Sequence, residues 1–193
     1  MRKDYLESEE SSFPEINQSE SKRTLYLALG STLTFILYSI IVLDSVGKCF
    51  RLEDGPNSLG LTFTYNLEMV QEFFELRNQD ELGCYRDFLK VWDVLFVVIY
   101  TSMYYFWVMY LFDKKKVFLA VPIIVMLADW GENFAEILMI DSYLDSNSIS
   151  ESLVSLGSWI NMVKWIFLSL TYLIILGGIV AKVKSFFTKI ESF

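Results

Sequence analysis

Residues 117–140 read VFLAVPIIVMLADWGENFAEILMI, a run of twenty-four residues that begins as an ordinary apolar segment. Its second half carries three carboxylates and one amide, from Asp129, Glu132, Asn133 and Glu136. On a helix these residues fall at positions i, i+3, i+4 and i+7, so they share one face. Because an ionisable group inside a membrane segment is costly, this face predicts a partner, a cavity or a function.

Three further apolar runs accompany this one. Residues 25–43 and 94–112 each hold nineteen residues without a charge, and residues 153–181 hold twenty-nine with a single lysine. A helix rises about 1.5 Å per residue, so roughly twenty residues cross the ~30 Å hydrocarbon core. Soluble helices average only about 11–12 residues. The four runs therefore predict four membrane-spanning helices.

Basic residues concentrate at one end of the predicted spans. They precede the first span, occupy the turn after the second and follow the fourth: Arg2, Lys3, Lys22, Arg23, Lys114, Lys115, Lys116, Lys182, Lys184 and Lys189. Loop 44–89 holds nine acidic residues against four basic ones. The positive-inside rule then predicts a multi-pass protein of the plasma membrane or an endomembrane, with both termini in the cytosol.

We therefore predict an all-α, integral membrane, antiparallel four-helix bundle with a small helical extracellular or lumenal cap. The predicted segments are a disordered cytosolic tail (1–23), spans at 24–43, 90–112, 117–140 and 153–181, a non-cytosolic loop with short helices (44–89), a short outer loop (141–152) and a basic cytosolic tail (182–193). Loop 44–89 is too small for a core of its own, so we expect it to cover the outer helix ends. Helices lying at the lipid headgroups are the alternative.

Both cysteines, Cys49 and Cys84, lie in the loop assigned to the non-cytosolic side, where a disulfide persists. Two separate buried thiols are the alternative. The cysteine spacing matches no metal or redox motif, and the chain contains no histidine. We therefore predict no metal site and no cofactor.

Antiparallel spans bring polar residues of three helices to one depth in the outer half of the membrane. Counting the helical rise from the ends of the spans puts Asp129 and Lys164 at nearly the same level. The predicted ligand-binding set is Asp93, Tyr100, Asp129, Glu132, Asn133, Asn161 and Lys164. We expect an Asp129–Lys164 ion pair, with Glu132–Lys164 as the alternative. Asp93 and Glu136 are expected to reach interfacial water.

The predicted cluster contains more acid than base. Counting Glu136, four carboxylates face one lysine, a formal charge of −3 if all are ionised. Crowded carboxylates hold a proton or bind a cation. Tyr100 and Tyr104 add an aromatic wall suited to an amine or a hydroxylated lipid. The alternative is that these polar groups only fasten the helices together.

Two residue patterns resemble those of a known group of proteins. Tyr85, Phe88, Asp93, Phe96 and Tyr100 lead into the second span, and Asp129, Glu132 and Asn133 form an Asp-x-x-Glu-Asn pattern in the third. By these patterns the protein resembles small four-span membrane proteins for which no activity is established. The resemblance covers about half of the chain. The resemblance implies only that the polar residues form a unit.

The sequence thus predicts binding or transport of a cation, an amine or a polar lipid at an acidic intramembrane site. A structural or adaptor tetraspan and a carboxylate-based lipid isomerase are the alternatives. The lack of histidine and of hydrolase or nucleotide motifs favours a protein that is not an enzyme. The net charge of −8 argues against nucleic acid as a partner. The expected partners are the lipid bilayer and a small cationic or lipid ligand.

Overall fold

The computed structural model describes residues 13–53, 55, 57–112 and 116–191, and this part of the chain is helical without any strand. Four of its helical stretches are long and apolar enough to cross a membrane: 20–47, 79–112, 117–146 and 151–185. This confirms the prediction of an all-α chain with four helices that are long and apolar enough to span a membrane. Residues 1–12 of the predicted tail and Lys114 and Lys115 of the predicted turn lie outside the described residues.

The helical segments join into long continuous stretches. The first comprises α2 (Phe13–Leu37), the π-helical η1 (Tyr38–Leu43) and α3 (Asp44–Gly47). The second comprises α5 (Gln79–Asp87), the π-helical η3 (Phe88–Asp93) and α6 (Val94–Phe112). The others are α7 (Lys116–Ser146) and α8 (Glu151–Glu191). Between the first two stretches lie a short 3₁₀ turn, η2 (Leu59–Leu61), and α4 (Leu67–Glu75).

The helices are longer than the apolar runs that predict them. Residues 13–23, predicted to be disordered, belong to α2, and the predicted basic tail is helical as far as Glu191. The predicted outer loop 141–152 shortens to 147–150, where Asn147 adopts a φ of 51° just after α7. Each extension has the same cause: once a helix is nucleated, adding a polar residue costs little.

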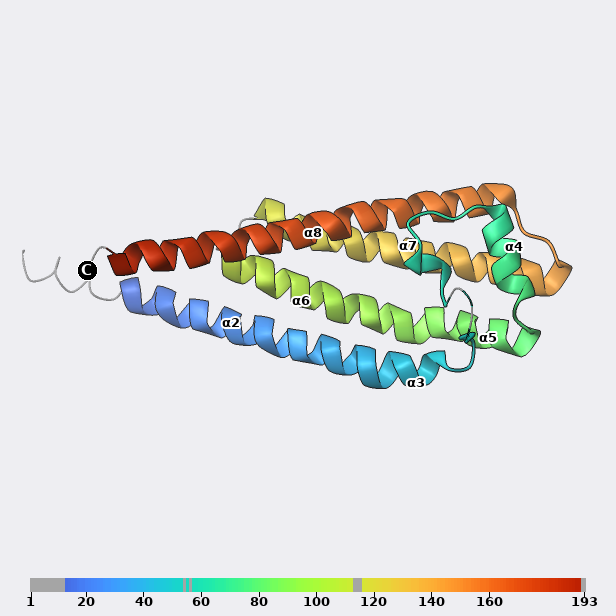
Figure 1. The fold of residues 1–193 in the computed structure, drawn as a ribbon, viewed down its shortest axis with the longest axis horizontal. Coiled ribbons are helices and arrows are strands. Elements are labelled where there is room, and N and C mark those ends of the chain that lie inside the picture. Colours follow the sequence, from blue (N-terminus) through green and yellow to red (C-terminus); the bar gives the residue numbers. More distant parts are fainter. Residues whose placement is uncertain (1–12, 54, 56, 113–115, 192–193) are drawn as a thin grey trace, which may run out of the picture.

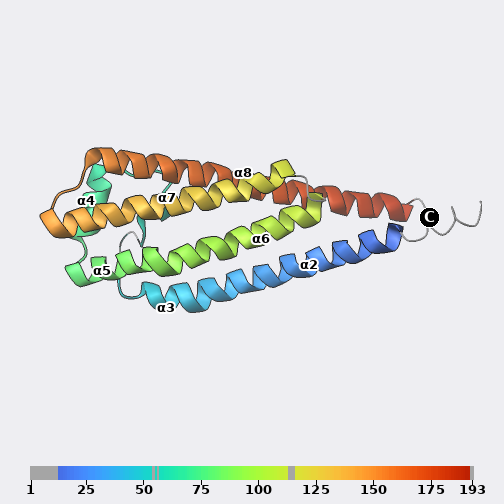
Figure 2. The same ribbon diagram turned by 180° about the vertical axis from the view of Figure 1, so that it is seen from behind.

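The four long stretches lie alongside one another, and successive ones run in opposite directions (Figure 1). Helix α7 packs along α8, and α6 contacts α2, α7 and α8. Figure 2 shows the same arrangement from behind, with α2 at the edge of the group beside α6. The outer face of α2 is apolar, with Leu29, Leu33 and Ile36 among its exposed side chains.

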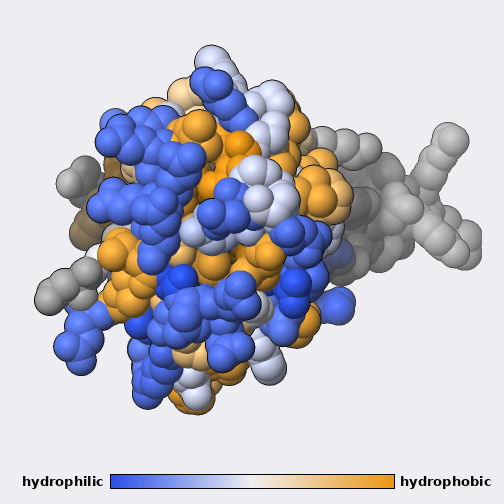
Figure 3. All heavy atoms as spheres, turned by 90° about the vertical axis from the view of Figure 1, so that its right-hand side faces the viewer, coloured by the Kyte–Doolittle hydropathy of each residue, from blue (hydrophilic) through white to orange (hydrophobic). Residues whose placement is uncertain are grey.

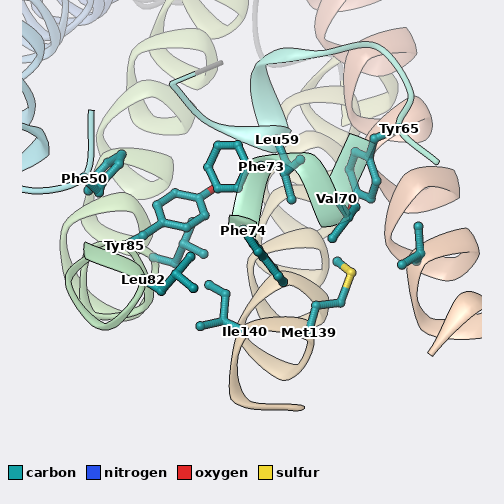
Figure 4. Close-up of a cluster of buried hydrophobic side chains, with 12 residues drawn as sticks. Phe50, Leu59, Tyr65, Val70, Phe73, Phe74, Leu82, Tyr85, Met139 and Ile140 are labelled. Atoms are coloured by element: carbon teal, nitrogen blue, oxygen red, sulfur yellow. The ribbon is translucent and has the colours of Figure 1, made fainter. Parts of the chain in front are cut away.

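The described residues of segment 48–78 (48–53, 55 and 57–78), which we call the cap, lie across the ends of α5, α7 and α8 (Figure 1). Helix α4 begins at Asn66, whose side chain accepts a hydrogen bond from the Met69 amide, and it buries Val70, Phe73 and Phe74. A single hydrophobic cluster joins the cap to the long helices (Figure 4): Phe50, Leu59, Tyr65, Val70, Phe73, Phe74, Leu82, Tyr85, Leu89, Met139, Ile140 and Val154. The cap therefore shares its core with the helix ends. Seen end-on in Figure 3, the surface of this end carries hydrophilic residues with hydrophobic ones between them.

Two connections fix the beginning of the cap. Cys49 and Cys84 form a disulfide with 6.3 Å between their Cα atoms, which ties the cap to α5. Buried Arg77 donates from Nε to the Phe50 carbonyl oxygen (2.9 Å) and from Nη1 to the Phe73 carbonyl oxygen (2.8 Å). Burial lowers the pKa of the Arg77 guanidinium from its ordinary value. Its hydrogen bonds to backbone oxygens offset part of that desolvation.

Replacing Arg77 by methionine is expected to lower the free energy of unfolding by about 1–3 kcal/mol, because it leaves buried carbonyl oxygens without donors. Denaturant unfolding of the purified protein in detergent micelles measures this. The matched control is Arg51→Met, which removes an exposed ion pair with Asp44 (2.8 Å) and should cost about 0–1 kcal/mol. Equal losses in the two variants would contradict the structural role of Arg77.

Candidate functional site

Polar side chains of α7 and α8 meet in the interior just below the cap. Glu132, Glu136 and Asn161 are 0%, 1% and 0% exposed. Asp129, Asn133 and Lys164 are nearly as buried. The helical spacing read from the sequence accounts for the α7 members, which lie on one face. The predicted polar residues of these two helices therefore lie in the interior and not on the outer surface of the protein.

Lys164 lies at the centre of this cluster. Its Nζ donates to Glu132 Oε2 and to the Gly60 carbonyl oxygen (3.1 Å), whereas Asp129 Oδ1 is 4.0 Å away. The expected Asp129–Lys164 ion pair is therefore present, but the alternative partner, Glu132, is the closer one and makes the direct hydrogen bond. A helical side chain points toward the N-terminus of its helix, which for α8 is the cap end. This brings the ammonium about one turn closer to Glu132.

The carboxylates of Asp129 and Asp93 are held by neutral donors. The Tyr100 hydroxyl donates to Asp129 Oδ2 (2.6 Å), and Asn133 Nδ2 donates to Asp93 Oδ2 (2.7 Å). Asp93 is the last residue of the π-helical η3. A π-helical turn changes the direction of the side chains that follow it and is frequent at functional sites. Four predicted residues therefore form two hydrogen-bonded pairs next to Lys164.

The sequence led us to expect that Glu136 reaches interfacial water, but the structure buries it. It is fully buried, accepts a hydrogen bond from the Tyr85 hydroxyl, and its carboxyl group interacts with that of Glu132. The Tyr85 hydroxyl also lies 3.0 Å from Ser58 Oγ of the cap. The expectation fails because the cap covers this end of α7. Glu136 and Tyr85 thus belong to the cluster although the predicted set omits them.

The cap contributes backbone groups that no residue pattern predicts. The Gly60 carbonyl oxygen accepts from Trp165 Nε1 (3.2 Å) as well as from Lys164, and the Thr62 carbonyl oxygen accepts from Asn161 Nδ2 (2.7 Å). Asn161 therefore binds the cap, not the polar residues of α7. A Cβ at position 60 would lie 3.0 Å from Glu132 Oε1 and 3.2 Å from Lys164 Nζ. This close approach explains the glycine.

Tyr65 of the cap lies beside the same carboxyl groups. Burial raises the pKa of its phenol well above the ordinary value, and the nearby Glu136 and Glu132 raise it further. Its hydroxyl stays neutral at physiological pH, because both the folded and the ordinary pKa lie far above it. Tyr65 is therefore a polar but uncharged neighbour of the cluster.

A partly open cavity of about 210 Å³ adjoins the cluster. Its polar wall is formed by Asp93, Asp129, Asn133, Glu136 and Lys164. Its aromatic wall is formed by Phe35, Phe96, Tyr100, Tyr104, Trp165 and Tyr172. Among the predicted set, Glu132 and Asn161 lie behind the wall instead of lining it. Five of the seven predicted residues thus face one cavity.

The charge of the site is unbalanced. Within the described residues, Lys164 is the ammonium that contacts these acids, against the carboxyl groups of Asp93, Asp129, Glu132 and Glu136. The described part of the chain contains no group of three or more His, Cys, Asp or Glu side chains placed to hold a metal ion.

No protein-family model, no curated protein and no solved structure matches this chain. What the site can bind must therefore be argued from its own geometry and charge.

Proposed function

We propose that this chain is a four-span integral membrane protein with both termini in the cytosol, whose cavity binds a small organic amine. Four helices of spanning length support the membrane assignment. The basic residues flanking one end of the spans support the orientation. The cavity would then lie in the outer half of an antiparallel bundle, beneath the cap.

The observation that carries the proposed function concerns the hydrogen-bond donors and the charge of the two aspartates that line the cavity. Asp93 and Asp129 receive hydrogen bonds from a neutral amide and a neutral phenol, while the Lys164 ammonium is engaged by Glu132. The same ammonium lies 4.0 Å from Asp129 Oδ1, so a single cation is shared between Asp129 and Glu132, with the carboxyl groups of Asp93 and Glu136 close by. A bound ammonium would supply charge-assisted hydrogen bonds to both carboxylates.

The aromatic wall supports the same ligand class. Tyr100 lies between Phe96 and Tyr104, with ring centroids 5.4 and 5.6 Å away. Aromatic faces attract a cation by about 0.5–2 kcal/mol and also pack an apolar body. Fastening of helices accounts for the Glu132–Lys164 pair. It gives no reason for three further carboxyl groups, those of Asp93, Asp129 and Glu136, to line a cavity of about 210 Å³.

Calorimetry on the protein in lipid nanodiscs tests this proposal, with 2-phenylethylamine as the probe and 2-phenylethanol as its uncharged counterpart. We expect the amine to bind and the alcohol to bind at least about tenfold more weakly. Asp129→Asn should weaken amine binding about ten- to a hundredfold, since a hydrogen bond to a charged group contributes about 1.5–3 kcal/mol.

The matched control is Asp145→Asn, which removes an exposed carboxylate from the same helix and should leave affinity unchanged. Asp93→Asn tests the second carboxylate independently if the first variant folds poorly. Equal binding of amine and alcohol, or loss of binding in the Asp145 control alone, would refute an acidic amine site.

A further inference from the structure

The cavity is partly open, and residues of α2 and α8 form part of its lining. Phe35 of α2 and Leu168 and Tyr172 of α8 line it. Among the described residues α2 packs along α6, but α2 and α8 form no comparable interface. Figure 1 shows these two helices diverging toward the cap, with α6 between them. Three of the cavity-lining residues, Phe35, Leu168 and Tyr172, therefore lie on two helices that share no such interface.

The cap closes the cavity at its outer end. Gly60 lines the cavity while its carbonyl oxygen is held by both Lys164 Nζ (3.1 Å) and Trp165 Nε1 (3.2 Å). Ser58, which also lines the cavity, lies 3.0 Å from the Tyr85 hydroxyl. A ligand arriving from the aqueous side would have to displace these contacts.

The exposed rim of the cavity near α2 and α8 is apolar. Leu61 is 68% exposed and Tyr172 is 46% exposed, and Phe35 and Leu168 are half-buried beside them. From this rim an aromatic wall leads inward, since Phe35 stacks on Phe96 (5.5 Å) and Phe96 contacts Tyr100. Tyr100 donates to Asp129. The path thus runs from an apolar edge, past aromatic faces, to a carboxylate.

We infer that the ligand is a membrane-dissolved long-chain amine, whose ammonium pairs with Asp93 and Asp129 while its alkyl chain leaves between α2 and α8. This inference rests on the proposed amine site and narrows its ligand class. A cavity of about 210 Å³ holds a head group and the first carbons of a chain. The remainder must extend through the apolar rim, where the surrounding lipid solvates it. Partitioning into the bilayer also concentrates such a ligand at the opening.

Photo-crosslinking in nanodiscs tests the inference. The probe is hexadecylamine with a diazirine in its chain, and the reference probe is the same chain ending in a hydroxyl group. We expect the amine to label the α2 peptide containing Phe35 and the α8 peptide containing Leu168, and the alcohol to label neither above the lipid background. Leu168→Trp should reduce labelling about tenfold, because it overfills the gap.

The matched control is Leu170→Trp, an exposed position on another face of α8 that does not line the cavity. It should leave labelling unchanged. If 2-phenylethylamine binds but hexadecylamine labels other surfaces instead, the lateral opening is wrong and the amine site stands. If 2-phenylethylamine itself does not bind, the proposed function and this inference both fail.

Discussion

Replacing Lys164 by methionine lowers the free energy of unfolding by about 3–5 kcal/mol, because it leaves the buried Glu132 carboxylate without a cation. Glu132 is 0% exposed, so water cannot replace the lost ammonium. The Gly60 carbonyl also loses its Lys164 donor, which loosens the cap. Denaturant unfolding in detergent micelles, followed by circular dichroism, measures the loss.

Two further variants isolate the ion pair. Lys184→Met removes an exposed lysine from the same helix and should change stability by less than about 0.5 kcal/mol. The double variant Lys164→Met/Glu132→Gln should recover much of the loss, since the uncompensated charge is gone. A double variant that is less stable than Lys164→Met alone would show that the pair is not the source of the effect.

Replacing both cysteines by serine is expected to lower the free energy of unfolding by about 3–4 kcal/mol, because the unfolded chain between them regains its conformational entropy. Cys49 and Cys84 are 35 positions apart. Cys84 directly precedes Tyr85, which contacts Glu136, so the same change should loosen the outer wall of the site. Unfolding of the Cys49→Ser/Cys84→Ser variant measures the loss.

Reduction provides the control for this experiment. A thiol reductant should destabilise the wild-type protein by a similar amount and leave the double serine variant unaffected. An unchanged stability in both cases would mean that packing of the cap, and not the disulfide, holds it on the helix ends.

The comparison of Asp129 with Glu136 shows how far residue spacing predicts this site. Both lie on the α7 face that the helical period defines, and that face is interior as expected. Depth alone suggested that Glu136 reaches water, because it lies near the end of the apolar run. Glu136 is buried instead, because the cap folds back over that end of α7.

Lys164 illustrates the part that spacing cannot resolve. The helical rise placed it level with both Asp129 and Glu132, less than a turn apart. The choice between them depends on the direction of a flexible side chain and on the Gly60 carbonyl, 104 positions away in the chain. A backbone oxygen is the same in every residue type, so no sequence pattern marks it.

The sequence by itself determined the four long helices, the acidic face of α7 and the excess of carboxylates over lysine, because helix length and period are local properties. Tertiary structure alone decided that Glu132 is the closest partner of Lys164, that the cap packs on the helix ends and that residues of α2, α6, α7, α8 and the cap line one cavity. These features arise from contacts between segments distant in the chain. Such contacts depend on packing, which no local pattern of residues specifies.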